Sequence, residues 1–331
     1  MQKKFLIIQT AFIGDVVLAT AVAEKLHDYY PDAQIDFLLR KGNEKLFDGH
    51  PFIKKVWVWN KKENKLFNLF KLTKQIRSEC YDEVINLQRF FSSGMFTLFS
   101  GAKNTRGFSS NPLSSFFKFV KPHSISVHGK LHEVERNQQL ISDITDEKYA
   151  NPKLYPSLKD KNKVALLVKQ PYVCCAPGSV WFTKRYPKSH WITFLKEAPA
   201  DLNVYFIGGK EDTALVNELI IESGNGKAQN WCGNLSYLES AALMSGARMN
   251  FTNDSAPLHF ASAMNAPVTA IFCSTVPAFG FGPLSDKSFI IETPKKLDCR
   301  PCGVHGFKKC PLGHFKCAYT ILPERLVINC Q

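Results

Sequence analysis

The sequence has 331 residues, of which 45% are hydrophobic, 12% aromatic and 21% charged. The length corresponds to two domains of ordinary size, and the composition is typical of a chain that buries a large core. Disordered, collagen-like and coiled-coil proteins are therefore excluded. The formal net charge of +13 favours an anionic partner such as a nucleotide, a nucleic acid or a phospholipid surface.

The amino terminus partly resembles a secretory signal peptide, because Lys3 and Lys4 precede an apolar run. Asp15 falls inside that run, and Gln9 and Thr10 interrupt it. We therefore expect a mature start and a cytoplasmic protein. The ten cysteines are too sparse for a secreted disulfide scaffold, which agrees with a reducing compartment. No apolar run reaches the ~18 residues of a membrane-spanning helix, so any membrane contact is expected to be peripheral.

The first part of the chain, residues 1–160, alternates β-rich segments with segments of helical periodicity. Strands are predicted at 4–9, 34–40, 56–60 and 83–87, and helices at 15–30, 65–79 and, from a weaker pattern, 93–101. Such alternation predicts a parallel sheet with helices on both faces. The pattern weakens after about residue 100, and the turn formers at 151–163 indicate a domain boundary.

The second part, residues 161–331, resumes the alternation. Strands are predicted at 172–178, 203–209, 248–253 and 267–273, and helices at 188–197, 211–223, 236–247 and 254–265. Ser236 and Glu239 have the spacing of a capping box and mark a helix start. The expected fold class is α/β, with two doubly wound, Rossmann-like domains at 1–160 and 161–331. Ligands of such sheets lie beyond the carboxyl ends of the strands, so the loops there are the candidate sites.

The loop after the first predicted strand contains Gly14 and Asp15. Gly14 permits a tight turn, and Asp15 stands at the mouth of the sheet where a helix begins. A helix N-cap is the simplest interpretation of Asp15, and a catalytic carboxylate is the alternative. Neither the dinucleotide fingerprint G-x-G-x-x-G nor the Walker loop is present there.

The segment 176–187 follows the first strand of the second domain. Gly178 lets the backbone approach a ligand, Ser179 and Thr183 offer hydroxyl groups, and Lys184 and Arg185 bring two cations to one strand end. These residues form a candidate diphosphate clamp. The alternative is a solvated basic loop without a ligand.

Two further loops follow strands of the second domain. Asp254 and Ser255 open a predicted helix, whose free amides attract anions, and His259 shares a helical face with Ser255. Taken alone, a histidine on such a helix is more often a packed or exposed residue than a ligand contact. In the second loop, two glycines allow close approach and a glutamate can accept from sugar hydroxyls: Gly208, Gly209 and Glu211.

Five segments in this order carry a family resemblance: GDVVLATAV, PGS followed by TKRYP, GGKED, WCGNLSYLESAALMSGA and NDSAPLHFASAMNAP. They resemble the ADP-heptose:lipopolysaccharide heptosyltransferases of glycosyltransferase family 9, of the heptosyltransferase II type. The resemblance implies a GT-B architecture, with two Rossmann-like domains facing a central cleft. It also implies an inverting, metal-independent transfer of heptose from ADP-heptose to the inner core of lipopolysaccharide, without a cofactor.

The resemblance also implies roles for individual residues. Asp15 would be the catalytic base, Lys184 and Ser179 would bind the donor diphosphate, and Asp254 would hold the heptose hydroxyls. Around the phosphates would lie Ser255, Ala256 and His259. The chain departs from the family pattern at Ala256, where glycine is common, at Tyr186, where tryptophan is common, and at Cys273-Ser274-Thr275, which replaces G-P-T.

Residues 84–132 contain no acidic residue but many phenylalanines and cations. We expect this stretch, with Gly14, to bind the acceptor through Arg89, Lys103, Arg106, Lys118 and Lys121. Such a surface suits a phosphorylated lipid at an anionic bilayer, and the expected location is the cytoplasmic face of the inner membrane. It would also suit a non-enzymatic protein that binds single-stranded nucleic acid. We expect no nucleic-acid partner, because that function leaves Asp15 and the Lys184 loop without a role.

Other interpretations remain open from the sequence. The same fold serves transferases that use another nucleotide sugar, and it serves sugar-nucleotide epimerases. A monomer is expected. Four cysteines near the carboxyl end are either metal ligands or unligated thiols, and irregular spacing after the first pair favours unligated thiols: Cys299, Cys302, Cys310 and Cys317.

Overall fold

The structure of the chain is a computed structural model that describes residues 2–330. It contains two compact units. The first extends to Ser124 and resumes at Leu131–Tyr155, and the second comprises Ile125–Lys130 and the chain from Pro156 onward. The main division therefore falls close to the expected boundary at 160, while a short segment within the first half belongs to the second unit.

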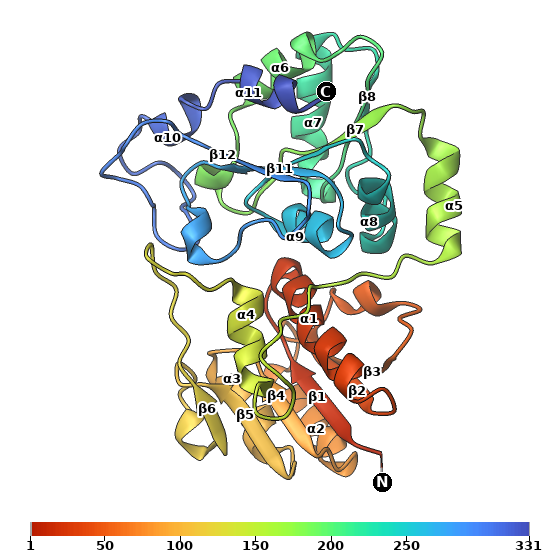
Figure 1. Cartoon of the computed structure of the whole chain (residues 1–331), viewed down its shortest axis with the longest axis vertical. Coiled ribbons are helices and arrows are strands. Elements are labelled where there is room, and N and C mark those ends of the chain that lie inside the picture. Colours follow the sequence, from red (N-terminus) through yellow and green to blue (C-terminus); the bar gives the residue numbers. More distant parts are fainter. Residues whose placement is uncertain (1, 331) are drawn as a thin grey trace. The chain divides into compact units, whose positions relative to one another are not determined.

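The first unit is built on a parallel sheet with the strand order β3-β2-β1-β4-β5-β6. Helices α1 and α4 cover one face of this sheet, and α2 and α3 cover the other (Figure 1). The strands are β1 (Lys4–Ile8), β2 (Gln34–Arg40), β3 (Ile53–Trp59), β4 (Glu83–Asn86), β5 (Asn104–Phe108) and β6 (Phe119–Lys121). The helices are α1 (Ile13–Tyr29), α2 (Lys65–Ser78), α3 (Phe91–Phe99) and α4 (Glu133–Gln138).

The apolar periodicity of the sequence accounts for this packing. Residues 5–8 of β1 are all buried, as expected for a central parallel strand with helices on both faces. On α2 the buried positions Leu69, Leu72 and Ile76 recur at helical spacing, and they join a core cluster with Trp57 and Trp59 of β3. The outward side of α2 contributes nothing to this core.

The second unit repeats the same arrangement, and its strand order is β12-β11-β10-β7-β8-β9. Read from the β9 end, with β7 counted as the first strand, this is the order of the first sheet. The strands are β7 (Tyr172–Ala176), β8 (Asn203–Phe206), β9 (Ala228–Asn230), β10 (Asn250–Asn253), β11 (Val268–Phe272) and β12 (Ser288–Glu292). The helices are α5 (Leu158–Leu167), α6 (Lys188–Glu197), α7 (Thr213–Ser223), α8 (Tyr237–Ser245), α9 (Ala256–Ala263), α10 (Lys316–Tyr319) and α11 (Glu324–Val327).

These two sheets confirm the predicted α/β class. The expected capping box is present at α8, where Ser236 Oγ accepts from the Glu239 amide at 3.1 Å and Glu239 Oε2 accepts from the Ser236 amide at 2.8 Å. None of the described helices is both long and apolar enough to span a membrane. The segment 151–163, whose turn formers indicated a domain boundary, also contains the start of α5, which Ser157 caps through Asp160.

The strand order determines where ligands bind. In each sheet the chain moves away from two adjacent strands in opposite directions, β1 and β4 in the first unit and β7 and β10 in the second. Such switch points open a crevice at the carboxyl ends of the strands. The loops after these four strands are therefore the first place to look for a site.

Candidate active site

Asp15 lies in the first turn of α1, at the switch point of the first sheet. The helix begins at Ile13, and its N-cap residue, Phe12, provides no side-chain hydrogen bond. The interpretation of Asp15 as the N-cap is therefore wrong, because Asp15 is already the third residue of the helix. A carboxylate in a first turn is favoured by the helix dipole, and Asp15 is only partly buried. Gly14 beside it is buried.

The two loops at this switch point are joined by polar contacts. Gln88, after β4, donates its side-chain amide to the side-chain oxygen of Gln9, after β1. Asn43 donates to the Ala11 carbonyl at 3.1 Å, and Asn111 donates to the Gln88 carbonyl at 2.8 Å. The backbone that carries Asp15 is therefore held by neighbouring loops and not only by its own helix.

In the second unit, Asn253 at the end of β10 holds the loop that follows β7. Its Nδ2 donates to the Pro177 carbonyl at 2.8 Å and to the Gly178 carbonyl at 3.3 Å, while its Oδ1 accepts from the Tyr186 amide at 2.9 Å. One buried side chain thus fixes both ends of the predicted diphosphate clamp. Sequence reasoning missed this role, although Asn253 precedes Asp254 in a motif that it had singled out.

Lys184 and Asp254 form an ion pair at this edge. Lys184 Nζ lies 2.6 Å from Asp254 Oδ2, and the side chains are only 14% and 8% exposed. Thr275, after β11, donates its hydroxyl to the same carboxylate oxygen at 2.6 Å. Lys184 comes from the β7 loop and Asp254 from the β10 loop, so the pair joins the two sides of the switch point.

Helix α9 begins immediately after this pair, and its N-cap is Ser255. The first amides of a helix have no partner within the helix and carry partial positive charge, so they favour an anion. Ala256 is the first helical residue, and His259 is buried one turn later. The structure therefore gathers Lys184, Asp254 and the predicted start of α9 in one place.

Arg300, a partly buried residue that sequence reasoning also missed, fixes Thr275. Arg300 donates to the Cys273 carbonyl at 2.7 Å, to the Thr275 carbonyl at 2.6 Å and to Glu292 Oε1 at 2.6 Å. These bonds hold the end of β11 in the position where the Thr275 hydroxyl reaches Asp254. The sequence around Arg300 contains no motif that predicts this role, because the partners of Arg300 are mainly backbone carbonyls.

Thr183 differs from its predicted role as a ligand contact. The residue is 1% exposed, and its hydroxyl oxygen accepts from the Ser274 hydroxyl at 3.0 Å and from the Phe307 amide at 2.8 Å. Gly306 lies against this hydroxyl with a φ of +77°, and a Cβ there would come within 2.8 Å of it. Thr183 is thus an internal anchor that positions Lys184.

Gly178 lies against the carboxylate of Asp212, the neighbour of the predicted residue Glu211. Glu211 is exposed, whereas Asp212 accepts from the Gly209 amide at 3.0 Å and lies against Gly178 and Gly208. Burial raises the pKa of Asp212, and nearby Glu211 raises it further.

The other two residues of the predicted clamp are tied together. Arg185 donates Nε–H to the Ser179 carbonyl at 2.7 Å, which closes segment 179–185 directly after Gly178. Both side chains remain partly exposed. They are therefore placed beside the Lys184 pair, on the same loop and at the same edge of the sheet.

Replacing Gly178 with alanine should strain this corner. The added Cβ would lie 2.3 Å from Asp212 Oδ1, so the carboxylate must move and lose its bond to the Gly209 amide. We expect a loss of about 1 kcal/mol in the free energy of unfolding, measured by chemical denaturation, and weaker ADP binding. Gly226→Ala is the matched control, because nothing lies within 4 Å of that Cβ position. Equal effects of the two variants would contradict this account.

The predicted acceptor residues fall into three groups. Arg106 is buried, with Nε 2.8 Å from Glu83 and Nη1 2.5 Å from Asp143. It is therefore not part of a basic surface, and its assignment to acceptor binding is wrong. A guanidinium paired on two sides inside the unit holds β4 and β5 together.

The other four cations are exposed but lie at opposite edges of the sheet. Arg89 follows β4 and Lys121 ends β6, so both lie at the carboxyl edge that carries Asp15. Lys103 and Lys118 precede β5 and β6 and lie at the other edge, where they contact Asp82 at 2.7 Å and Asn104 at 2.6 Å. Only Arg89 and Lys121 are in a position to serve one site with Asp15.

The carboxyl-terminal cysteines form no disulfide within residues 2–330. Cys299 Sγ lies 3.9 Å from His314 Nε2, and Cys302 donates to the Cys299 carbonyl. Burial, together with nearby Cys302, raises the pKa of Cys317 to about 12. Within residues 2–330, no group of three or more histidine, cysteine, aspartate or glutamate side chains is arranged to hold a metal ion.

Comparison with known proteins agrees with this arrangement. Residues 69–309 match the sequence profile of Glycosyltransferase family 9 (heptosyltransferase). The chain is 26% identical to lipopolysaccharide heptosyltransferase 3 of Escherichia coli, over 80% of this chain and 82% of that protein. It is 25% identical to lipopolysaccharide heptosyltransferase 2 of Escherichia coli K12, over 87% and 88% of the two chains. The solved structure of E. coli ADP-heptose lps heptosyltransferase II superposes with a TM-score of 0.81, at 20% identity, over 98% of this chain and 97% of that one.

Proposed function

Because the chain belongs to glycosyltransferase family 9 (heptosyltransferase), we propose that this glycosyltransferase moves heptose from ADP-heptose to the inner core of lipopolysaccharide. The observation that carries the proposal is the Lys184–Asp254 pair, which stands at the start of α9 and at the switch point of the second sheet. That position supplies positive charge for a diphosphate and a carboxylate for sugar hydroxyls.

On the donor side, Lys184 and the first amides of α9 neutralise the diphosphate. Charge accumulates on the leaving ADP as the bond to the sugar breaks, and donors fixed in advance stabilise that charge better than mobile water does. Thr183 and Asn253 supply this rigidity, because both hold the backbone on either side of Lys184. Asp254, held by Lys184 and Thr275, keeps one carboxylate oxygen for hydroxyl groups of the heptose.

On the acceptor side, Asp15 serves as the base. Inversion requires the acceptor oxygen to attack the anomeric carbon from the face opposite ADP, and the attacking hydroxyl must lose its proton. Asp15 is partly exposed, lies in a first helical turn and stands at the carboxyl edge of its sheet. A phosphorylated inner-core acceptor would then contact Arg89 and Lys121 at the same edge.

We propose further that the protein works as a monomer on the cytoplasmic face of the inner membrane, to which it binds peripherally, and that its reaction needs no metal cofactor. The net charge of +13 supports attraction to an anionic bilayer. Lys184 and the start of α9 support a reaction without a metal, because they provide the positive charge that a divalent cation supplies in metal-dependent enzymes.

Donor selection tests this function. Binding of ADP-heptose should be at least about tenfold tighter than that of UDP-sugars in calorimetry, and it should weaken as salt concentration rises. Transfer to a heptose-deficient lipopolysaccharide acceptor should release ADP in proportion to the glycosylated product. Preference for another nucleotide sugar would contradict the donor assignment, and conversion of the sugar without transfer would indicate an epimerase.

A further inference from the structure

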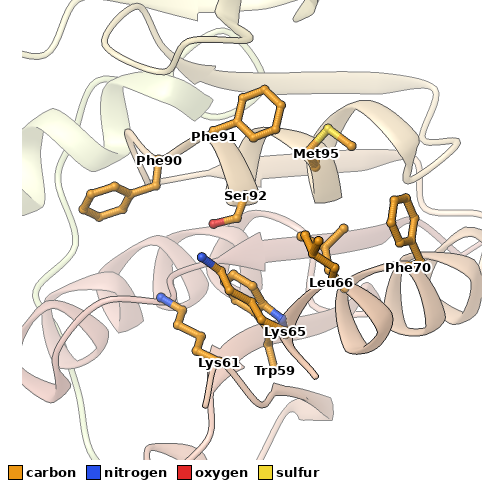
Figure 2. A pocket seen from close by; sticks show the side chains of 10 residues that line it. Trp59, Lys61, Lys65, Leu66, Phe70, Phe90, Phe91, Ser92 and Met95 are labelled. Atoms are coloured by element: carbon orange, nitrogen blue, oxygen red, sulfur yellow. The ribbon is translucent and has the colours of Figure 1, made fainter. Parts of the chain in front are cut away.

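A hollow of about 430 Å³ opens on the first unit between α2 and α3. Trp59 of β3, Leu66 and Phe70 of α2, and Phe90 and Phe91 at the start of α3 line it. Figure 2 shows Phe90, Phe91, Ser92 and Met95 on one side of the hollow, and the residues of β3, α2 and the loop between them on the other. The donor and base residues described above do not line it.

The rim of this hollow is apolar and exposed. Leu66 and Phe67 are each 68% exposed, Phe70 is 61%, Phe90 is 50% and Phe91 is 57% exposed. Phe67 and Phe70 are three residues apart on α2, so they share its outward face. Because Leu69, Leu72 and Ile76 already fill the core, the outward residues are not needed for folding. A contiguous exposed apolar surface of this kind marks a site of interaction.

Cations surround the same surface. Neither α2 nor α3 has an acidic residue in its first turn, and no aspartate or glutamate occurs anywhere in their sequences. Four cations project from α2: Lys65, Lys71, Lys74 and Arg77. In the preceding loop, the carboxylate of Glu63 bonds to Asn60 at 3.0 Å. The four cations of α2 outnumber this one carboxylate, so the surface keeps a net positive charge for an external anion.

Lys61 adds a cation inside the hollow. Its Nζ donates to the Thr10 carbonyl at 2.7 Å and lies 4.9 Å from the centre of the Trp59 ring. Burial, together with the nearby charges of Arg40 and Lys65, lowers the pKa of Lys61 to about 8. An anion at the mouth of the hollow would relieve the mutual repulsion of these cations.

We propose that the outward face of α2, together with Phe90 and Phe91, docks the protein on an anionic phospholipid bilayer, with the hollow receiving a lipid acyl chain. Phe67 and Phe70 enter the boundary between headgroups and chains, while Lys71 and Lys74 contact lipid phosphates. Interfacial helices combine these two features, an apolar face and a basic flank. This inference identifies the surface by which the protein would contact the membrane. It rests on the proposed function in one respect, namely that the acceptor is located at that membrane.

The lining of the hollow favours lipid over nucleic acid or peptide. Apart from the indole of Trp59, the polar side chains that line it are those of Lys61, Lys65 and Ser92. A base edge or a peptide backbone would need more hydrogen-bond partners than these. An acyl chain needs none, and the cations at the rim suit its phosphate.

Co-sedimentation with vesicles tests the docking surface. The full-length protein should bind phosphatidylcholine vesicles containing 30% phosphatidylglycerol about tenfold more tightly than pure phosphatidylcholine vesicles. Phe67→Ser with Phe70→Ser should reduce that binding about tenfold, and Lys71→Gln with Lys74→Gln should remove most of the preference for the anionic lipid. Ile221→Ser with Leu166→Ser is the matched control, because these side chains are 78% and 87% exposed on the other unit.

The outcomes separate this inference from the proposed function. The Phe67 and Phe70 variant should melt like the parent, bind ADP like the parent and glycosylate a deacylated, water-soluble acceptor at the parental rate. Vesicle binding without any heptose transfer would reject the proposed function but keep the docking surface. Unchanged vesicle binding in both pairs of variants, or their selective loss of binding to a single-stranded oligonucleotide, would overturn the docking surface.

Discussion

Replacing Asp15 with asparagine should lower the rate of heptose transfer by ~100-fold or more, because an amide cannot accept the proton of the acceptor hydroxyl. The free energy of unfolding should change by less than about 1 kcal/mol, since asparagine keeps the size of the side chain and a hydrogen-bonding oxygen and gives up the favourable charge in the first turn of α1. ADP-heptose affinity should stay constant, because the donor residues belong to the second unit. Steady-state kinetics, calorimetry and thermal melting measure the three quantities.

Asp160→Asn provides the matched control for that experiment. Asp160 is likewise the third residue of its helix, α5, but it lies at neither switch point. We expect a modest loss of stability, because Asp160 belongs to a capping box, and transfer at the parental rate. If Asp15→Asn also transferred heptose at the parental rate, Asp15 would be only a stabilising first-turn carboxylate and another base would be required.

Replacing Lys184 with alanine should lower kcat/KM for the donor by more than tenfold, which corresponds to more than ~1.4 kcal/mol. The variant lacks the cation that meets the diphosphate, and Asp254 then faces the donor as an uncompensated carboxylate. The salt dependence of donor binding should also become weaker than in the parent, because one fewer positive charge is screened.

Lys188→Ala is the control for Lys184→Ala. Lys188 lies four residues further along, and its ammonium contacts Glu218 at 2.7 Å and Glu222 at 2.5 Å on the surface of the second unit. Its removal should leave donor kinetics unchanged. Parental kinetics and salt dependence in Lys184→Ala would exclude the lysine from the diphosphate site.

The regular parts of the fold could be predicted because burial leaves a periodic pattern. β2 and α9 are long apolar segments between turn formers, and each was expected close to its observed position. β5 was missed because its sequence, NTRGF, contains an asparagine and a glycine and lacks strand periodicity. Its place is set by tertiary contacts, among them the buried Arg106–Glu83 pair.

The same pair explains why the acceptor surface was predicted only in part. The stretch without acidic residues begins at Val84, directly after Glu83, so it excludes both partners of Arg106 by sequence position. Charge counts along a chain do not reveal such pairing across strands. The donor loops were easier to predict, because the ends of parallel strands converge regardless of how individual side chains pair.

Segment 125–130 limits how this protein can be divided or recombined. The chain enters the second unit at Ile125, returns to the first at Leu131 and leaves it again at Pro156. Gly129 lies so near the Ala278 backbone that a Cβ would come within 2.9 Å of that carbonyl oxygen, so the fit is specific to its partner loop. A chimera of two family members joined at a single point near residue 156 would combine this segment with a foreign loop. Donor-domain exchanges in this chain therefore need three junctions, with residues 125–130 taken from the parent that supplies the carboxyl-terminal half.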